Sequence, residues 1–373
     1  MTDSKKLVII GGGAAGLLLA KLLSSDSGRL GLEITLVDCK DFFEFTPAMC
    51  SVLYENTDEE FKKHFQNVTA DYASVLAPLQ VKFILGIVEE LNTEDQVINL
   101  RGNRSVSYDY CVICTGSSCH TPWKSSCETT TSLQDRLEYL QSQRERYKTA
   151  KEILCIGAGA LGVEVAAEIC LRDPSKSVTL ISSQPVLASA PGNLGAGAQT
   201  VLSNIPSLKL IINESATSTD GRHYETDKSK TTIRPDLVYI CSGITPNTGF
   251  LRKSHPQWLN EKNFIKVDQC LKASDNVFAV GDVNAIDDPK MFYTARTQAV
   301  HTATNIKRIL KGHEPIPYKA PPRAMMVSLG PTRAVGYMMG ITLNGWPGDR
   351  KRGSKLASFA KRVVERTTMD AYG

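Results

Sequence analysis

Three glycines near the N-terminus have the spacing that binds the pyrophosphate of a dinucleotide. Gly11, Gly13 and Gly16 form a G-x-G-x-x-G motif directly after the apolar run at 7–10, and a helix is predicted over 17–23. The first glycine of this motif makes a tight turn, the second lets phosphates approach the backbone, and the third lets the helix pack on the strand. The N–H groups and the dipole at the start of the helix then favour the bound anion.

An acidic residue completes this unit. The strand predicted over 33–38 ends in Asp38, which lies 22 residues after Gly16 and near the distance expected for an acid that binds ribose hydroxyls. Because strand, glycine turn, helix, strand and acid occur in this order, we predict a dinucleotide site rather than a chance glycine turn. Ala14, within the glycine motif, belongs to the predicted site.

The same pattern recurs 146 residues further along the chain. An apolar run at 153–156 precedes a second G-x-G-x-x-G motif, a helix predicted over 163–171 and a strand predicted over 177–181. The residues predicted to hold this second dinucleotide are Gly157, Gly159, Leu161, Gly162, Ser182 and Ser183. Two such units in one chain imply FAD in one and NADH or NADPH in the other, because a flavin accepts a hydride and releases electrons singly or in pairs.

The second unit lacks the closing acid. Ser182, Ser183 and Gln184 follow the strand where the first unit has Asp38. An acid at this point repels the 2′-phosphate of NADPH, whereas an arginine attracts it. Small hydroxyl groups do neither strongly, so the sequence predicts weak discrimination between NADH and NADPH.

The cysteines and histidines do not form a redox or metal site by their spacing. Cys39 and Cys50 are eleven residues apart, and Cys111 and Cys114 fall on a predicted strand, where residues i and i+3 face opposite ways. We therefore predict reduced thiols and electrons that leave the flavin directly for a diffusing acceptor. No metal is predicted, because the six histidines show neither an H-x-x-x-H pair nor a cysteine partner at zinc spacing.

Composition indicates an ordinary globular protein with a basic end. The chain has 373 residues, 42% apolar and 22% charged, which excludes disordered, collagen-like and coiled-coil classes. Residues 345–373 hold seven Lys/Arg and three Asp/Glu, and the other 344 residues hold 36 of each sign. A neutral globule argues against a nucleic-acid partner.

The ends of the chain bear on its location. Three consecutive glycines break the N-terminal apolar run, so we predict no signal peptide. Position 2 is not glycine, which excludes N-myristoylation, and no stretch of eighteen apolar residues predicts a transmembrane helix. We expect a cytoplasmic protein.

Three further motifs give the chain a family resemblance. Residues 110–116 resemble the strand and Ala-Thr-Gly crossover of two-dinucleotide flavoproteins, 237–247 resemble their second crossover, and 276–282 resemble the strand whose Gly-Asp holds the flavin ribityl chain. Over about 5–310 the chain resembles the pyridine-nucleotide-disulfide-oxidoreductase superfamily. Within it, the chain is most similar to apoptosis-inducing-factor-like flavoproteins of the ferroptosis-suppressor type, which are quinone reductases, and to type II NADH dehydrogenases.

The resemblance implies roles for individual residues. It implies FAD contacts at Gly11, Gly13, Gly16, Asp38, Lys40, Asp41, Val88, Thr115, Gly116, Gly281, Asp282 and Met291. Gly243 lies in the second crossover and is assigned to the NAD(P)H side. Glu164 would reach the nicotinamide, or would be an ordinary helix glutamate. Lys290 would stabilise the reduced flavin or bind a quinone carbonyl, or would be a surface lysine, and a helix is predicted to open at Pro289.

The motifs predict an α/β protein with two Rossmann-like dinucleotide-binding domains, for FAD and NAD(P)H, and a small C-terminal α+β module. The FAD-binding domain is predicted over 1–117 and 244–310, with the NAD(P)H-binding domain at 118–243 inserted between the crossovers. The C-terminal module would comprise 311–373, with short strands over 324–329 and 334–339.

The last residues have the pattern of a basic amphipathic helix. Apolar residues from Leu356 to Val364 fall at i, i+3, i+4, i+7 and i+8, and basic residues surround them. Residues 350–366 are therefore predicted to contact an anionic membrane surface, the alternative being a helix packed on the flavin domain.

The sequence thus favours an FAD-dependent NAD(P)H:quinone oxidoreductase. A reductase of a small redox protein, such as a ferredoxin or rubredoxin, and an apoptosis-inducing-factor-like signalling flavoprotein remain the alternatives. The electron acceptor, the pathway and the oligomeric state, a homodimer included, stay open.

Overall fold

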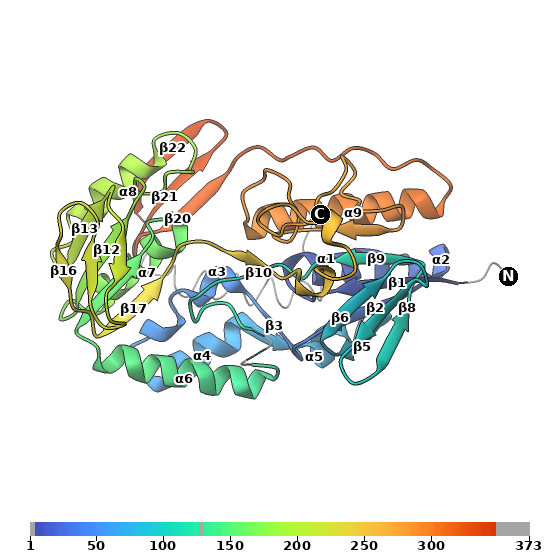
Figure 1. The fold of residues 1–373 in the computed structure, drawn as a ribbon, viewed down its shortest axis with the longest axis horizontal. Helices are drawn as coiled ribbons and strands as arrows, with labels where there is room; N and C mark the ends of the chain where they lie inside the picture. The colour runs from blue at the N-terminus through green and yellow to red at the C-terminus, as the bar shows by residue number, and fades with distance from the viewer. Residues whose placement is uncertain (1–3, 127, 129, 348–373) are drawn as a thin grey trace.

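A computed structural model describes residues 4–126, 128 and 130–347 of the chain and shows an α/β protein with two parallel sheets (Figure 1). The first sheet has the spatial order β19 (Val277–Ala279), β9 (Tyr110–Ile113), β1 (Lys5–Ile10), β2 (Leu32–Asp38) and β5 (Val81–Leu85). All its pairings are parallel. The apolar run at 7–10 is buried throughout, as expected for a parallel strand covered on both faces.

The second sheet repeats this arrangement with fewer strands. Its order is β13 (Leu208–Ile212), β12 (Ser177–Ser182), β11 (Glu152–Ile156) and β17 (Leu237–Ile240), again all parallel. The strand before each glycine turn has equivalent neighbours in the two sheets. β1 lies between β2 and β9, and β11 lies between β12 and β17. In each case one neighbour follows the helix after the turn, and the other leads into a crossover. The strands predicted around both glycine motifs are therefore confirmed.

Each sheet is covered by two helices, one of which begins at its glycine turn. α1 (Ala14–Ser24) packs beside α9 (Phe292–Leu310) on the first sheet, and α7 (Ala160–Arg172) and α8 (Leu194–Ser203) cover the second. The helix predicted to open at Pro289 is present and extends to Leu310, but it begins only at Phe292 with Met291 as its N-cap, so its predicted start was wrong. Lys290 Nζ donates to the carbonyl of Asn284 at 2.7 Å, which ties the preceding segment into a loop.

Two long helices run side by side below the sheets in Figure 1. α4 (Asp58–Val68) and α6 (Leu133–Thr149) each begin with a capping box, formed by Thr57 and by Ser132. Arg136 on α6 is fully buried and donates to Glu44 Oε2 at 2.8 Å, so α6 is anchored to the segment that follows the first sheet's β2.

Shorter elements complete the chain. The short helices are α2 (Ser27–Leu30), α3 (Thr46–Met49), α5 (Tyr72–Leu76), η1 (Val52–Tyr54), η2 (Gly249–Leu251) and η3 (Pro256–Trp258). The antiparallel strands are β3 (Phe42–Glu44) with β4 (Thr69–Asp71); β6 (Val88–Asn92), β7 (Val97–Leu100) and β8 (Arg104–Ser107); and β14 (Ala216–Ser218), β15 (Tyr224–Thr226) and β16 (Thr232–Ile233).

The C-terminal strands form a sheet of their own. β20 (Met325–Ser328) and β21 (Arg333–Met338) confirm the two predicted strands, and β22 (Ile341–Pro347) was not predicted. This sheet packs on α7 and α8 at the left of Figure 1. The predicted basic helix at 350–366 lies outside the described residues.

No helix within the described part of the chain is long and apolar enough to cross a membrane.

Candidate functional site

The three motif glycines of the first turn differ in the space around them. Gly13 borders open space, whereas Gly11 and Gly16 have no room for a side chain. A Cβ on Gly16 would lie 1.9 Å from the carbonyl oxygen of Gly11, and a Cβ on Gly11, whose φ is +97°, would lie 2.5 Å from the carbonyl oxygen of Cys114. A Cβ on Gly13, in contrast, would meet no heavy atom within 4 Å. The outer glycines are therefore required by the fold, and Gly13 faces open space.

The second glycine turn has the same geometry. A Cβ on Gly162 would lie 1.9 Å from the carbonyl oxygen of Gly157, whose φ is +108°. A Cβ on Gly159 would again meet nothing within 4 Å. The two turns are thus built alike, although the residues between their glycines differ.

Both turns fit a dinucleotide pyrophosphate. Gly13 and Gly159 are the N-caps of α1 and α7, and neither helix has a side chain that caps its first N–H groups. These N–H groups lie at the positive end of the helix dipole, beside the open space over the two glycines. Ala14 and Leu161, both predicted to contact a dinucleotide, lie in the first turns of these helices, which begin three residues earlier than predicted.

Asp38 is buried and holds the first turn in shape. Its Oδ2 accepts from the Gly12 N–H at 2.6 Å, and its Oδ1 accepts from the Lys40 N–H at 2.9 Å. The Tyr72 hydroxyl also donates to Oδ2, at 3.3 Å, and a Cβ on Gly12 would lie 2.3 Å from that hydroxyl oxygen. Tyr72 therefore covers the turn, and sequence reasoning missed it.

The other residues predicted at the adenosine end lie around the strand ends. Lys40 Nζ donates to Ser125 Oγ at 2.8 Å, and Asp41 Oδ1 accepts from the Leu133 N–H, the first residue of α6, at 3.0 Å. Val88 begins β6 and is partly buried. Asp41 thus lies at the start of α6.

The two crossovers bind each other. β10 (Ser117–Ser118) pairs antiparallel with β18 (Thr245–Pro246). Thr115 Oγ1 donates to the carbonyl of Asn247 at 2.8 Å, and Asn247 donates back from its Nδ2 to the carbonyl of Thr115 at 2.8 Å. Thr115 and Gly116 therefore lie where the chain passes between the two sheets, and Gly243 lies on the neighbouring crossover.

Asp282 is joined to the first crossover by a lysine that the sequence did not point to. Its Oδ2 accepts from Ser117 Oγ at 2.8 Å and from Lys124 Nζ at 3.1 Å. Lys124 Nζ also donates to Ser117 Oγ at 2.7 Å. The lysine thus fixes the carboxylate that the family resemblance assigns to the flavin ribityl chain.

We expect Lys124→Met to weaken FAD binding without unfolding the protein. The ion pair between Lys124 and Asp282 is partly exposed, so its loss leaves no fully buried charge without a partner and the fold should persist. The loss of the charge-assisted hydrogen bonds of Lys124 should lower the affinity for FAD roughly tenfold. The measurement is FAD release in a dilution series, followed by the rise in flavin fluorescence. Lys272→Met, which removes an exposed pair with Asp275, is the control; equal FAD release by the two variants contradicts the assignment.

The start of α9 meets the first glycine turn. A Cβ on Gly281 would lie 3.5 Å from the Cβ of Ala295 and 3.7 Å from the Cβ of Ala15, so α9, α1 and the Gly-Asp strand end converge. Gln298 Oε1 accepts from the Gly281 N–H at 2.8 Å and fixes this strand end to α9. Gln298 is a positioning residue that sequence reasoning missed.

Lys290 lies near this point, and its ammonium group is already hydrogen-bonded to backbone carbonyls. Its Nζ donates to the carbonyls of Asn284 at 2.7 Å and Ile286 at 3.0 Å, and it lies over the ring of Phe264. Burial lowers the pKa of Lys290, and Asp282 partly offsets this. The observed contacts favour a structural lysine that holds the loop before α9.

Glu164 lies on α7, one turn past the second glycine motif. Its Oε1 accepts from the Ser328 N–H of β20 at 3.1 Å, and the thiol of Cys50 donates to the same carboxyl group. Desolvation raises the pKa of Glu164 to about 7, and the negative charge of Glu168 adds to this, while the Ser328 and Cys50 hydrogen bonds oppose it. Glu164 thus joins three parts of the chain and titrates near neutrality.

A buried ionic network continues from Glu164 along α7. Arg172 donates to Glu168 Oε2 at 2.7 Å and to Glu55 Oε2 at 2.9 Å. His64 faces Glu55 Oε1 at 2.7 Å through Nδ1 and the carbonyl of Ala48 at 3.1 Å through Nε2. His64 thus connects Glu55 with the carbonyl of Ala48 on α3.

The end of β12 shows no basic group at the predicted ribose position. Ser182 is buried, and its Oγ accepts from the Gln184 N–H at 3.2 Å, while Ser183 is exposed. The nine cysteines within the described residues are all free thiols, and six of them are buried.

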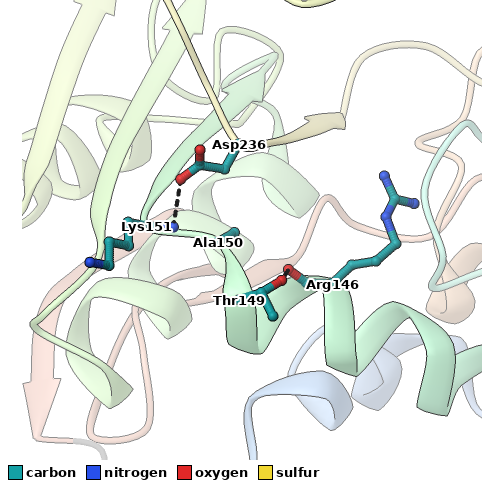
Figure 2. A pocket seen from close by; sticks show the side chains of 5 residues that line it. All are labelled: Arg146, Thr149, Ala150, Lys151 and Asp236. Carbon is teal, nitrogen blue, oxygen red and sulfur yellow. Dashed lines mark hydrogen bonds between the residues drawn. The ribbon is translucent and has the colours of Figure 1, made fainter.

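A surface pocket lies at the opposite end of the second sheet. It is lined by Arg146, Thr149, Ala150, Lys151 and Asp236, and Asp236 accepts from the Lys151 N–H at 2.8 Å (Figure 2). Lys151 and Asp236 precede β11 and β17, so the pocket is at the amino ends of these strands. Ligands of such sheets bind at the carboxyl ends, where the glycine turn lies.

Comparison with known proteins places this arrangement in a family. Residues 5–305 match the pyridine nucleotide-disulphide oxidoreductase family. The chain is 30% identical to the oxidoreductase ptaL of Pestalotiopsis fici, over 92% of this chain and 94% of that protein. It is 28% identical to ferroptosis suppressor protein 1 of Xenopus laevis, over 91% of this chain and 90% of that protein.

A solved structure shows the same fold. The sulfide:quinone oxidoreductase of Aquifex aeolicus superposes with a TM-score of 0.75 at 19% identity, covering 98% of this chain and 91% of that one. Two joined dinucleotide-binding units of this fold define a flavoprotein oxidoreductase. The chain belongs to the pyridine nucleotide-disulphide oxidoreductase family, uses FAD, and takes NADH or NADPH as its co-substrate.

Proposed function

We propose that this protein is an NAD(P)H:quinone oxidoreductase. The observation that carries the proposal is the pair of matched glycine turns joined by the β10–β18 crossover, in a chain whose described cysteines form no disulfide. Because the described residues show no dithiol relay, a bound flavin would transfer its electrons directly to a diffusing acceptor. The similarity to ferroptosis suppressor protein 1 and to a sulfide:quinone oxidoreductase supports a quinone as that acceptor.

The residues of the chain would bind and orient the two nucleotides. Gly13 and the first turn of α1 would hold the FAD pyrophosphate, and Gly159 and the first turn of α7 would hold that of NAD(P)H. The bound flavin supplies hydride acceptance and electron release. Glu164 would accept from the nicotinamide carboxamide, and Asp282, held by Lys124, would accept from a ribityl hydroxyl. We retain the division into an FAD-binding part at 1–117 and 244–310 and an NAD(P)H-binding part at 118–243 as a proposal. It is supported by the sheets, since the strands of the first come from 5–113 and 277–279 and those of the second from 152–240.

An aromatic pair at the start of α9 supports a planar apolar acceptor. The rings of Phe45 and Phe292 meet edge to face with centroids 4.9 Å apart, and the neighbouring Tyr293 is 48% exposed. Aromatic side chains present apolar faces on which a ring stacks. A quinone would approach the flavin over Phe292 and the exposed Tyr293, beside the point where α9 and α1 converge.

Anaerobic reoxidation tests the proposed acceptor. The purified protein is reduced with NADH, and a short-chain quinone, ferricyanide or a ferredoxin is then added in turn while flavin absorbance is followed. We expect fast reoxidation by the quinone. Fast reoxidation by the ferredoxin alone, with rates that fall as salt rises, would instead identify a reductase of a small redox protein.

Ser182→Glu tests the predicted lack of nucleotide discrimination. We expect wild-type KM values for NADH and NADPH to be similar, since Ser182 and Ser183 carry no charge at the end of β12. A carboxylate there would repel the 2′-phosphate and raise the KM for NADPH about tenfold more than that for NADH. Ser182→Gln is the uncharged control. Equal changes for the two nucleotides would show that this residue does not face the ribose.

A further inference from the structure

The sheet β20–β22 turns one face toward the body of the protein. A Cβ on Gly192, in the loop before α8, would lie 2.8 Å from both Tyr337 Cε2 and Thr342 Oγ1. Tyr337 pairs directly with Thr342 on one side and with Met325 on the other. Because directly paired residues of antiparallel strands point to the same face, this row is the inward face of the sheet.

The alternate row is apolar and points outward. Met326 pairs with Gly336, and Met338 pairs with Ile341, so these residues lie on the face opposite Tyr337. Met326, Met338 and Ile341 are 67%, 59% and 62% exposed, and Met339, in the turn between the strands, is 83% exposed. We call Met326, Met338, Met339 and Ile341 the methionine face.

No other part of the described chain leaves so much apolar surface in water. The four residues of the methionine face are the most exposed large hydrophobic side chains among the described residues, ahead of Tyr293 and Val300. Isolated exposed hydrophobic residues are common, but a contiguous group of this kind marks an interaction site. Methionine is flexible and polarizable, which suits a surface without fixed shape.

The methionine face is joined in sequence to the chain's excess positive charge. Residues 348–373, which follow β22 directly, contain seven Lys/Arg and three Asp/Glu, while the rest of the chain has equal numbers of both signs. Apolar residues that enter the acyl boundary and basic residues that face anionic headgroups are the two components of peripheral membrane binding. Charge complementarity therefore favours an anionic lipid surface over a second, equally basic copy of this chain.

We propose that the methionine face is a docking surface for an anionic lipid bilayer. The inference rests on the proposed function, because a lipophilic quinone resides in such a bilayer. It goes beyond the basic segment, since it assigns insertion to folded side chains on β20–β22. The exposed turn at Met339 and the side chains of Met338 and Ile341 would enter the interface first.

Vesicle flotation of the full-length protein tests this proposal. The probes are vesicles of phosphatidylcholine alone and of phosphatidylcholine with phosphatidylglycerol. We expect the wild type to float with the anionic vesicles, and the double variant Met338→Ser/Ile341→Ser to bind at least about tenfold more weakly, since two apolar side chains no longer leave water. Val300→Ser, which removes a 47% exposed side chain from α9, should bind like the wild type.

Any of three results would overturn the proposal. A wild type that stays unbound, or a double variant that binds as well as the wild type, shows that the methionine face does not meet lipid. A wild-type dimer that the double variant converts to a monomer, measured by light scattering, shows that the face is covered by a second copy. If the double variant loses its flavin colour, Met326→Ser replaces it and must show the same loss of binding.

The readout separates this proposal from the proposed function. Turnover with NADH and a water-soluble quinone does not need a bilayer, so the double variant should retain it. Lost vesicle binding with intact turnover supports docking and function together. Intact vesicle binding by a protein that transfers no electrons to quinone would refute the function alone.

Discussion

Gly159→Val will keep the protein yellow but abolish its reduction by NADH, and Gly13→Val will remove the flavin. A Cβ at either position meets no heavy atom within 4 Å, and both residues have extended backbone conformations that valine adopts readily. The substitution therefore leaves the protein's own packing intact. It fills only the space into which the phosphates of a dinucleotide would enter.

The expected effects are large because phosphate binding requires close approach to the backbone. Displacing a bound nucleotide by about 1 Å costs on the order of a hundredfold in rate. We therefore expect Gly159→Val to lower the rate of flavin reduction by NADH at least that much, measured by stopped flow. Reduction by dithionite should be unchanged, since it does not need the second turn.

Two control variants accompany Gly159→Val and Gly13→Val. Gly28→Val places a side chain in equally open space on the short helix α2, and it should bind FAD and NADH normally. Gly162→Ala puts a Cβ 1.9 Å from the Gly157 carbonyl oxygen, so it should lower the unfolding temperature as well as NADH binding. A Gly159→Val protein that NADH reduces at the wild-type rate would exclude the second turn as the NAD(P)H site.

The glycine units were predictable because their requirements are local. Gly11 and Gly157 both need positive φ, and Gly16 and Gly162 both need the absence of a side chain next to a carbonyl only five residues away. These requirements restrict each position to glycine, so the motif can be recognised in the sequence by its G-x-G-x-x-G spacing. The buried parallel strands were predictable for a similar reason, since both faces must be apolar.

The residues that hold the predicted side chains in place were not predictable. The partners in these contacts are distant in sequence: 158 residues separate Lys124 from Asp282, and 34 separate Tyr72 from Asp38. No local sequence pattern therefore predicts either pair. Gln298 binds the strand end at Gly281 from a helix whose start the sequence misplaced. These contacts arise only when separate elements pack together.

Some missed elements carried a signal. Thr57 with Glu60 and Ser132 with Asp135 form the capping boxes of α4 and α6, and this spacing can be read from the sequence. The burial of Arg136 on α6 could not, because its partner Glu44 lies 92 residues away. The hydrogen bonds of Lys290 to backbone carbonyls could not be predicted either, because a backbone acceptor requires no particular residue type in the sequence.

The position of Glu164 links nucleotide binding to the C-terminal sheet. Its carboxyl group lies on α7, the helix that begins at the second glycine turn, and it binds Ser328 of β20. The ionic network of Glu168, Arg172 and Glu55 holds the same helix against the part of the chain that follows β2. Changes at Glu164 will therefore be felt both in NADH binding and in the stability of this junction.

Glu164→Gln will remove a pH dependence centred near 7. Above this pH the wild-type carboxylate is ionised and, in the proposed site, would accept strongly from the nicotinamide carboxamide, so the KM for NADH should fall as pH rises through about 7. Glutamine does not titrate and accepts more weakly, which should raise the KM at pH 8 or so by roughly tenfold to a hundredfold. Initial rates with NADH across the pH range measure both effects.

The stability of the protein gives an independent readout with a definite sign. The folded-state pKa of Glu164 lies above its ordinary value of 4.5, so the folded protein binds this proton more tightly than the unfolded chain does. Its contribution to stability is complete below 4.5 and is lost as pH rises through about 7. Urea unfolding of Glu164→Gln should therefore lack that part of the decline.

Glu152→Gln is the matched control, because Glu152 is exposed at the amino end of β11, away from the glycine turn. It should reproduce the wild-type KM and the wild-type pH profile of stability. If Glu164→Gln shows the stability change but a wild-type KM profile, Glu164 only joins α7 to β20. If both profiles keep their inflection near 7, another group titrates there and the assignment to Glu164 fails.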